Sequence, residues 1–376
     1  MTAPPDVQAP EKWEYLATTN RGLEEVAIDE IARLTGFRPS ISHPGMVRFT
    51  ADERAIYRLH AHGRSIHRLL LELARTTATT IESITETVHN LDVPQYLGPD
   101  QSFAVRAQRS GDHAFGSPDI EAAVGQAVID SARERDGTRP PVDLEEPDLI
   151  FRLSLRDDTL SIAIDTTGQH SHHRRQYRVS EHDAALRPTI ALAMLQYAGY
   201  TPSARLVDPM CGGGTIPIEA ARIATGRPVI PTHEPAFTRF HFLEADRYER
   251  LLDAPATATT QPNISGYDVA AGAIDSAGEN AREGDVAEIL DLAVRDSTTG
   301  TFDADLIVTD MPFGIRTNSD LHALYRDFFE TLGRSSWDRL VLHTARDDLV
   351  PLDASTAIPM RRGRLETTIL VVESDE

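Results

Sequence analysis

The sequence contains a single cysteine, Cys211, and a single lysine, Lys12, among its 376 residues. One cysteine excludes an intramolecular disulfide and a zinc site built from several cysteines of one chain. No apolar run reaches the roughly 18 residues that a membrane-spanning helix needs. Residues 1–6 have neither the basic nor the apolar region of a signal peptide. We therefore expect a cytoplasmic protein without a membrane segment, and the length suits two or three domains.

Basic residues are also scarce: 37 arginines and lysines stand against 58 acidic residues, which gives a formal net charge of −21. This balance resembles that of proteins adapted to a very salty cytoplasm, such as the cytoplasm of a halophilic archaeon. Such acidity ordinarily argues against nucleic acid as a partner. At about 1 M salt, however, the Debye length is about 3 Å, so net charge no longer repels a polyanion at a distance. RNA therefore remains a candidate partner, bound through shape, stacking and a few close arginines.

The N-terminal half predicts two small α+β units. Residues 1–12 are proline-rich and predict a loose tail. Residues 13–75 show strand-like and helix-like patterns in the order βαβαβ, which suits a small split-βαβ domain. Residues 76–170 add strands, the helix 120–132 and a hairpin that turns at residues 157–158. Nothing catalytic is visible in the first unit, which could be a plain packing domain.

Three residues of the second unit are candidate RNA contacts. Arg106 lies in the predicted strand 102–108, and Arg109 and Phe115 lie in the polar segment that follows. The alternative is that the arginines are merely solvated and that Phe115 belongs to the core.

Residues 170–178 form the most basic stretch, and no acid interrupts the chain between Asp165 and Glu181. Arg174, Arg175 and Arg178 offer forked donors that suit RNA phosphate. A solvated linker is the alternative. A metal site is disfavoured, because the histidines of this stretch have no cysteine or paired carboxylate nearby.

A triple-glycine stretch organises the C-terminal half. Leu206 and Val207 end a short apolar run, as a buried strand would, and residues 215–225 have helical spacing. Between them, residues 212–214 are all glycine, which tolerates positive φ and exposes backbone N–H groups to a ligand. Strand, glycine turn and helix predict the first βα unit of a doubly wound sheet that binds a nucleotide-like ligand. Alone, the glycine stretch could be only a tight turn.

Two aspartates follow the next predicted strands. Asp268 ends the strand 264–269, where an acid takes the ribose hydroxyls of a bound nucleoside. Asp296 ends the strand 290–296, where it can accept a hydrogen bond from an adenine amine. A loop-capping role is the alternative for each.

Residues 310–314, Asp-Met-Pro-Phe-Gly, follow the buried strand 306–308. The exocyclic amine of a base is a poor nucleophile, because its lone pair is delocalised into the ring. A carboxylate at Asp310 can accept a hydrogen bond from that amine and offset the positive charge that grows during methyl transfer. The carbonyl of Met311 can accept the second hydrogen, Pro312 stiffens the turn, and Phe313 can stack on a flipped-out base.

These motifs resemble a known family. Residues 310–314 are similar to the Asp/Asn-Pro-Pro-Tyr/Phe signature of S-adenosylmethionine-dependent amino-methyltransferases. Together with residues 208–215, Asp-Pro-Met-Cys-Gly-Gly-Gly-Thr, they resemble the THUMP-domain RNA methyltransferases. Residues 18–25, 103–117 and 173–178 resemble that family's ferredoxin-like opening, THUMP core and linker, except that Gln176 replaces the usual glycine. The Met-Pro-Phe variant most resembles the tRNA (guanine(6)-N2)-methyltransferases, although many relatives have proline where Met311 stands.

The resemblance implies an α/β fold class: a Rossmann-like methyltransferase domain, with a doubly wound sheet and an antiparallel terminal hairpin, preceded by a ferredoxin-like plus THUMP α+β region. Its implied parts are the flexible tail 1–12, the ferredoxin-like domain 13–75, the THUMP RNA-binding domain 76–170, the basic linker 171–183 and the methyltransferase domain 184–376.

It also implies the site residues. The residues expected to contact or adjoin S-adenosylmethionine are Asp208, Pro209, Cys211, Gly212, Gly214, Thr215, Asp268, Val269, Asp296, Ser297 and Asp310. Those expected in the catalytic pocket are Asp310, Met311, Pro312 and Phe313.

The implied activity is methyl transfer from S-adenosylmethionine to the exocyclic N2 of a guanine in the tRNA acceptor stem, at position 6. The THUMP domain would hold the 3′ CCA end, and the enzyme would act as a monomer. No metal is expected, because the sulfonium leaving group is already activated. The alternatives are N2-methylation of another guanine, such as tRNA position 10 or an rRNA site, and a non-catalytic RNA-binding protein.

Overall fold

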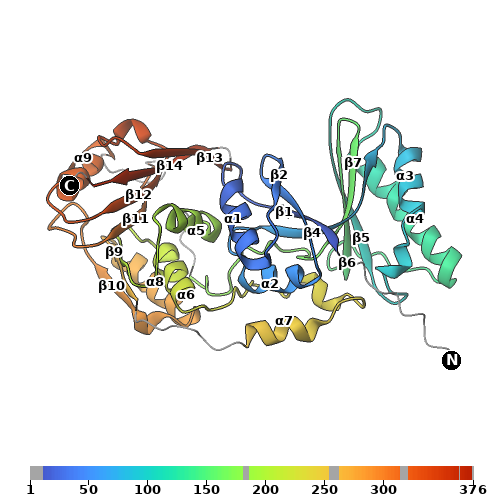
Figure 1. The fold of residues 1–376 in the computed structure, drawn as a ribbon, viewed down its shortest axis with the longest axis horizontal. Coiled ribbons are helices and arrows are strands. Elements are labelled where there is room, and N and C mark those ends of the chain that lie inside the picture. Colours follow the sequence, from blue (N-terminus) through green and yellow to red (C-terminus); the bar gives the residue numbers. More distant parts are fainter. Residues whose placement is uncertain (1–11, 181–185, 254–261, 314–320, 364, 375–376) are drawn as a thin grey trace.

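The computed structural model describes residues 12–180, 186–253, 262–313, 321–363 and 365–374. Residues 1–11 of the expected tail 1–12, the end of the linker at 181–183 and Gly314 lie outside these residues. Two seven-stranded sheets form the frame of the described chain, and Figure 1 shows them side by side along the long axis of the molecule. No helix in the described part is long and apolar enough to cross a membrane.

The N-terminal unit has the order βαββαβ. Its elements are β1 (Trp13–Thr18), α1 (Glu24–Thr35), β2 (Ser40–His43), β3 (Met46–Ala51), α2 (Arg54–His62) and β4 (Arg68–Thr77). The predicted order βαβαβ is therefore wrong by one strand. The missed β2 forms a hairpin with β3 around Gly45, which has a φ of +81°. It is a short edge strand with Ile41 as its single apolar residue, so it lacks the alternation that identifies buried strands.

The second unit continues the same sheet. Its elements are α3 (Ile81–His89), β5 (Phe103–Ser110), α4 (Ser117–Asp136), β6 (Leu149–Arg156) and β7 (Thr159–Asp165). Strand β4 pairs with β7 in antiparallel fashion, which gives the strand order β2-β3-β1-β4-β7-β6-β5. The two N-terminal units therefore share one hydrogen-bonded sheet.

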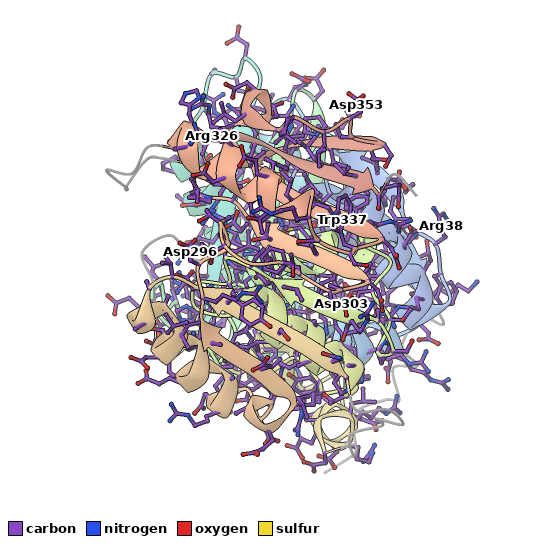
Figure 2. All side chains as sticks on the ribbon, turned by 90° about the vertical axis from the view of Figure 1, so that its left-hand side faces the viewer. Arg38, Asp296, Asp303, Arg326, Trp337 and Asp353 are labelled. Atoms are coloured by element: carbon purple, nitrogen blue, oxygen red, sulfur yellow. The ribbon has the colours of Figure 1, made fainter. Side chains whose placement is uncertain are left out.

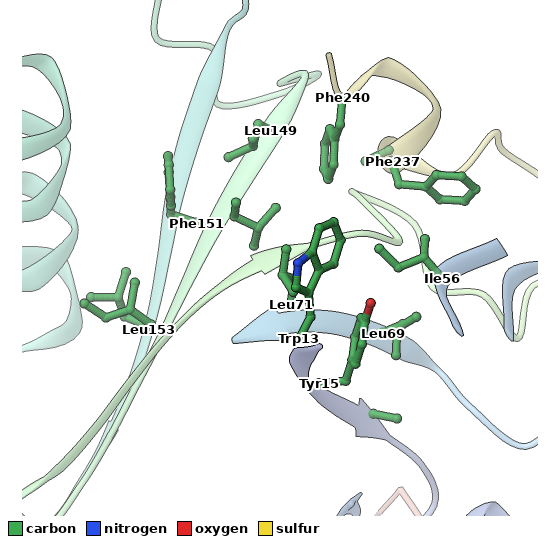
Figure 3. Close-up of a cluster of buried hydrophobic side chains, with 14 of the residues drawn as sticks. Trp13, Tyr15, Ile56, Leu69, Leu71, Leu149, Phe151, Leu153, Phe237 and Phe240 are labelled. Atoms are coloured by element: carbon green, nitrogen blue, oxygen red, sulfur yellow. The ribbon is translucent and has the colours of Figure 1, made fainter. Parts of the chain in front are cut away.

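One face of this sheet carries the helices and a continuous core, because side chains alternate between the two faces along each strand. Figure 3 shows Trp13 and Tyr15 from β1 near Leu69 and Leu71 from β4, with Phe151 farther along the same core. One hydrophobic core thus spans both units.

Part of this core comes from the C-terminal half. Phe237 and Phe240 belong to or follow η2 (Ala236–Arg239), yet both are buried against the N-terminal core (Figure 3). Helix α7 (Ala245–Leu252) lies beside α2 in Figure 1 and buries Tyr248 there. The segment that contains η2 and α7 therefore fastens the C-terminal half to the first sheet.

The second sheet has the strand order β10-β9-β8-β11-β12-β14-β13, with β14 antiparallel to both of its neighbours. Its strands are β8 (Arg205–Asp208), β9 (Asn263–Asp268), β10 (Leu290–Val294), β11 (Leu306–Asp310), β12 (Arg339–Thr344), β13 (Thr356–Arg362) and β14 (Leu365–Glu373). Its helices are α5 (Pro188–Tyr197), α6 (Thr215–Ala224), α8 (Ala271–Glu283) and α9 (Leu321–Leu332). The predicted fold class, a doubly wound sheet with an antiparallel terminal hairpin, is confirmed.

A buried cluster of charges joins the two sheets. The carboxylate of Glu219, on α6, is fully buried and accepts hydrogen bonds from Arg64 at 2.8 Å, Arg175 at 3.3 Å and the Tyr177 hydroxyl at 3.0 Å. Arg64 belongs to the N-terminal unit, and its backbone N–H donates to Glu30 of α1. Because an unpaired buried charge is strongly destabilising, these contacts fix the two sheets relative to each other.

Candidate functional site

The glycine loop connects the carboxyl end of β8 to α6. Gly212 and Gly214 have φ angles of +51° and +80°, which residues with a side chain rarely adopt. A Cβ atom on Gly214 would lie 3.0 Å from the Cβ of Ala277 on α8, so glycine is also needed for close packing. The loop therefore brings its backbone against α8, and the N–H groups of Gly212 and Gly214 donate to Asp268 and to the carbonyl of Cys211.

A cavity of about 190 Å³ opens beside this loop. Its lining includes Asp208, Cys211, Gly212, Thr215, Asp268 and Asp310. Strands β8 and β11 are neighbours in the sheet but their crossovers run in opposite directions, which is the point where ligands bind in open α/β sheets. The fold thus brings the tips of three strands together at one cavity.

Asp208 is the most deeply buried acid of the cavity, with 1% exposure. Burial is the main reason that the pKa of Asp208 is raised to about 8. Hydrogen bonds to its carboxylate lower this pKa, and the neighbouring carboxylates of Asp310 and Asp268 raise it by smaller amounts. Positive charge in this cavity would favour the ionised form of these acids, so the cavity suits a cationic ligand.

Asp310 is held on both of its oxygens. His343 Nδ1 lies 2.7 Å from Oδ1, and Arg362 Nη1 lies 3.5 Å from Oδ2. The ring of Phe313 packs edge-on against His343, with 5.3 Å between centroids, and Arg362 lies over the same ring at 5.7 Å. Asp310 and Phe313 are therefore supported by one shared pair of side chains.

Neither His343 nor Arg362 was identified from the sequence. Both come from strands distant in the chain, and only the strand order brings them to β11. One signal was available: His343 is an ionisable residue directly after the apolar run 340–342 of β12.

Four other residues that were predicted to contact or adjoin the cofactor are not among those that line the cavity: Pro209, Val269, Asp296 and Ser297. Val269 is 70% exposed, directly after the tip of β9, and offers an apolar surface outside the cavity lining. Pro209 and Ser297 are buried. Asp296 is exposed, does not line the cavity, and accepts hydrogen bonds from the backbone N–H and hydroxyl of Thr298. These bonds lower the pKa of Asp296 and favour the loop-capping alternative for this residue. Figure 2 shows Asp296 and Asp303 near opposite ends of the strands of the second sheet.

The predicted RNA contacts of the second unit point in different directions. Arg106 lines a large groove on the open face of the first sheet. Arg109 is three positions further along β5 and therefore lies on the opposite face. Phe115 packs against the hydrophobic core, which is the structural alternative for this ring. Only Arg106 of the three faces the groove.

The predicted contacts of the linker also separate. Arg174 is exposed and Arg178 is half-buried. Arg175 is 3% exposed, and its guanidinium bonds Glu219 and the carbonyls of His172 and Arg64. A buried arginine with these partners cannot reach RNA, so the expectation that Arg175 contacts RNA is corrected: the residue joins the two sheets.

The groove on the open face of the first sheet has a volume of about 510 Å³. Five arginines line it, and we call this feature the arginine groove; they are Arg68, Arg75, Arg106, Arg152 and Arg156. Arg68 and Arg152 share the buried carboxylate of Asp165, which fixes their positions. In a chain with a net charge of −21, such a concentration of arginine marks a site for an anionic partner.

Comparison with known proteins matches three segments to family models. Residues 14–70 match the RlmL ferredoxin-like domain, residues 78–165 the THUMP domain and residues 175–366 the RMKL-like methyltransferase domain.

Two curated proteins and one solved structure are similar over most of the chain. The tRNA (guanine(6)-N2)-methyltransferase of Methanocaldococcus jannaschii is 32% identical over 89% of this chain and 91% of its own. The protein of the same name from Archaeoglobus fulgidus is 33% identical over 88% of this chain and 83% of its own. The structure of SMU.472 with SAH superposes with a TM-score of 0.87, 23% identity and coverage of 98% of this chain and 100% of the other.

Proposed function

This chain belongs to the family of THUMP-containing, RMKL-like methyltransferases, and we propose that it methylates the exocyclic N2 of a guanine in the acceptor stem of tRNA, at position 6. The observation that carries the proposal is the cavity shared by Asp310, the glycine loop and Asp268. Asp310 supplies a carboxylate that can accept a hydrogen bond from an amine, next to the glycine loop and the acid at the tip of β9 where this fold binds nucleosides.

The residues of the cavity fit S-adenosylmethionine, the methyl donor of the family. The positive-φ glycines carry no side chain that would block the cavity, the carboxylates suit its cationic groups, and Asp268 at the tip of β9 can bind its ribose hydroxyls. When bound, the cofactor supplies an electrophilic methyl group on a positively charged sulfur. Val269 offers an apolar surface beside Asp268 for the adenine ring.

Asp310 performs the central step. Its carboxylate accepts a hydrogen bond from the guanine amine and stabilises the positive charge that develops on nitrogen as the new N–C bond forms and the bond between the methyl group and the donor sulfur breaks. The methylated nitrogen then loses one proton, which passes to this carboxylate or to solvent. The carbonyl of Met311 accepts the second amine hydrogen. The carbonyl of Pro312 is 3.3 Å from the Tyr325 hydroxyl, which fixes the turn, and Phe313 stacks on the flipped base.

The arginine groove supports tRNA as the substrate. Its guanidinium groups suit the phosphates of an RNA end, and Arg174 and Arg178 provide further candidates between the groove and the catalytic half. In this proposal the groove holds the 3′ CCA end, while the cavity at Asp310 receives the guanine. The boundaries 13–75, 76–170 and 184–376, a monomeric state and a cytoplasmic, high-salt setting remain predictions from the sequence.

The test is methyl transfer to an unmodified tRNA transcript, followed by digestion and mass mapping of the product. We expect N2-methylguanosine in the acceptor stem. Asp310→Asn keeps the side-chain shape but removes the charge, so we expect kcat to fall by about 10²–10³ with tRNA affinity close to wild type. Asp327→Asn, at a surface carboxylate on α9, is the matched control.

Each outcome identifies one alternative. Methylguanosine at another tRNA position or only in rRNA would refute the acceptor-stem assignment. Unchanged turnover of Asp310→Asn would reject the role of this carboxylate. RNA binding without any methyl transfer by the wild type would favour the non-catalytic RNA-binding protein.

A further inference from the structure

His343 occupies an unusual position for an ionisable side chain. It is fully buried near the carboxyl end of β12, directly after Leu340, Val341 and Leu342, which are buried too. It is also the register partner of Asp310 on the adjacent parallel strand β11. A buried imidazole loses its hydration, so specific contacts must offset the loss.

Those contacts all reach the segment 310–313. The ring nitrogen Nδ1 of His343 lies 2.7 Å from Asp310 Oδ1. Its backbone carbonyl accepts the N–H of Met311 at 3.0 Å. The rings of His343 and Phe313 are in contact, with 5.3 Å between their centroids and 83° between their planes. One residue therefore supports the carboxylate, the backbone after it and the aromatic ring.

The direction of the hydrogen bond follows from chemistry. An ionised carboxylate is only an acceptor, so Nδ1 must carry the hydrogen and donate it to Asp310. The second ring nitrogen, Nε2, is buried and has no hydrogen-bond partner among the described residues. A leucine of similar size would fill this space without an unpaired polar atom, so packing alone does not explain a histidine. Buried polar atoms without a hydrogen-bond partner are uncommon, and they concentrate at functional sites.

We propose that His343 is a positioning residue for methyl transfer. By donating to Oδ1, it fixes the plane of the Asp310 carboxylate, so that the remaining lone pairs face the cavity and the target amine. By packing against Phe313, it couples the orientation of the carboxylate to that of the ring on which the base stacks. His343 itself touches neither base nor cofactor. The inference rests on the proposed function, because it assigns a role to the same site.

Two substitutions separate positioning from packing. His343→Leu removes the donor and keeps the volume, whereas His343→Asn places an amide N–H close to the position of Nδ1. We expect His343→Leu to lower kcat by about 10–100-fold, as displaced catalytic groups do. We expect KM for tRNA, and the affinity for S-adenosylhomocysteine measured by calorimetry, to stay within about threefold. His343→Asn should recover most of the lost kcat.

Coupling to Asp310 gives a second readout. In the Asp310→Asn background, His343→Leu should cause little further loss, because both changes disable one unit. His60→Leu is the control for replacing a buried histidine, because His60 is also fully buried, bonds the carbonyl of Ile56 and lies in the N-terminal unit. It should leave kcat unchanged.

Several results would overturn the proposal. They are a wild-type kcat in His343→Leu, loss of cofactor binding in parallel with kcat, failure of His343→Asn to recover activity, and full additivity with Asp310→Asn. Failure of the proposed function is seen separately, in the wild type. If the wild type methylates another RNA, the same variants are compared on that RNA. If it methylates none, both proposals fall.

Discussion

The carboxylate of Asp268 accepts a hydrogen bond from the backbone N–H of Gly212, with 3.0 Å between Oδ2 and the nitrogen. Its other oxygen accepts the N–H of Ala270 at 2.9 Å. The tip of β9 therefore holds the glycine loop of β8 in place, in addition to the ribose-binding role expected for this acid. Each oxygen keeps a lone pair for a ligand hydroxyl.

Replacing Asp268 by alanine should weaken cofactor binding. The variant loses the ribose contact and the bond that fixes the loop, together about 2–3 kcal/mol, or roughly 30–150-fold in Kd for S-adenosylhomocysteine. Calorimetric titration measures this directly. Asp291→Ala, at an exposed carboxylate on the neighbouring β10, is the matched control and should bind normally. Equal affinity of the two variants would contradict the assignment.

Asp208 predicts a pH-dependent stability. Burial raises its pKa from 3.8 to about 8, so the folded protein retains a proton that the unfolded chain releases between these values. The contribution of Asp208 to stability should therefore fall as pH rises from about 4 to 8 and change little outside this window. Asp208→Asn removes the ionisation and should gain on the order of a few kcal/mol over wild type at pH 9 relative to pH 4.

Thermal unfolding of the ligand-free protein at pH 4, 6, 8 and 9 checks this prediction. The measured quantity is the difference in Tm between Asp208→Asn and wild type, which should increase by several degrees across the series. A difference that does not change with pH would show that Asp208 ionises as readily in the fold as in the unfolded chain.

Two glycines with opposite environments test the loop. Gly214→Ala forces a side chain onto a φ of +80° and against Ala277, so we expect a loss of about 1–3 kcal/mol in stability. Gly125 lies in the middle of α4, where nothing lies within 4 Å of an added Cβ. Gly125→Ala should therefore stabilise by about 0.5–1 kcal/mol. Denaturant titration measures the free energy of unfolding of both variants. A loss in Gly214→Ala with a gain in Gly125→Ala would show that the loop requires glycine, whereas similar values would show that both positions tolerate alanine.

Neighbouring arginines of the linker should behave differently. Arg175→Ala leaves Glu219 buried with fewer partners, and we expect a stability loss of about 3–5 kcal/mol. Arg174→Ala changes an exposed side chain and should leave stability unchanged. If Arg174 contacts phosphate, its loss should weaken tRNA binding and lower the salt slope of binding by about one. Unfolding curves and salt-dependent binding titrations separate the two roles, and a reversed pattern would contradict them.

The sequence predicted what local pattern encodes. The triple glycine, the apolar strands and the acids that follow them were enough for the fold class and for the meeting of Asp208, Asp268 and Asp310 at one cavity. Local pattern did not distinguish the buried Arg175 from the exposed Arg174, because that difference arises from the approach of Glu219, 44 residues away.

Long-range contacts explain the remaining differences. His343 reaches Asp310 across 33 residues, and Arg362 across 52. Phe237 and Phe240 complete the core of a sheet formed by residues 13–165. The arginine groove likewise combines side chains of β4, β5 and β6, whose alternation becomes a common face only once the strands pair.

Within the residues that the structure describes, the pairing of β4 with β7 and the buried Glu219 cluster join the sheet of the arginine groove to the sheet that carries Asp310. On the proposed function, the distance between the arginine groove and Asp310 selects the target guanine. The arginine groove would hold the terminus of the RNA. The distance from the groove to Asp310 would then set the number of base pairs between that terminus and the reactive guanine. The choice of target would then depend on the position of the guanine along the stem and not on the bases that flank it.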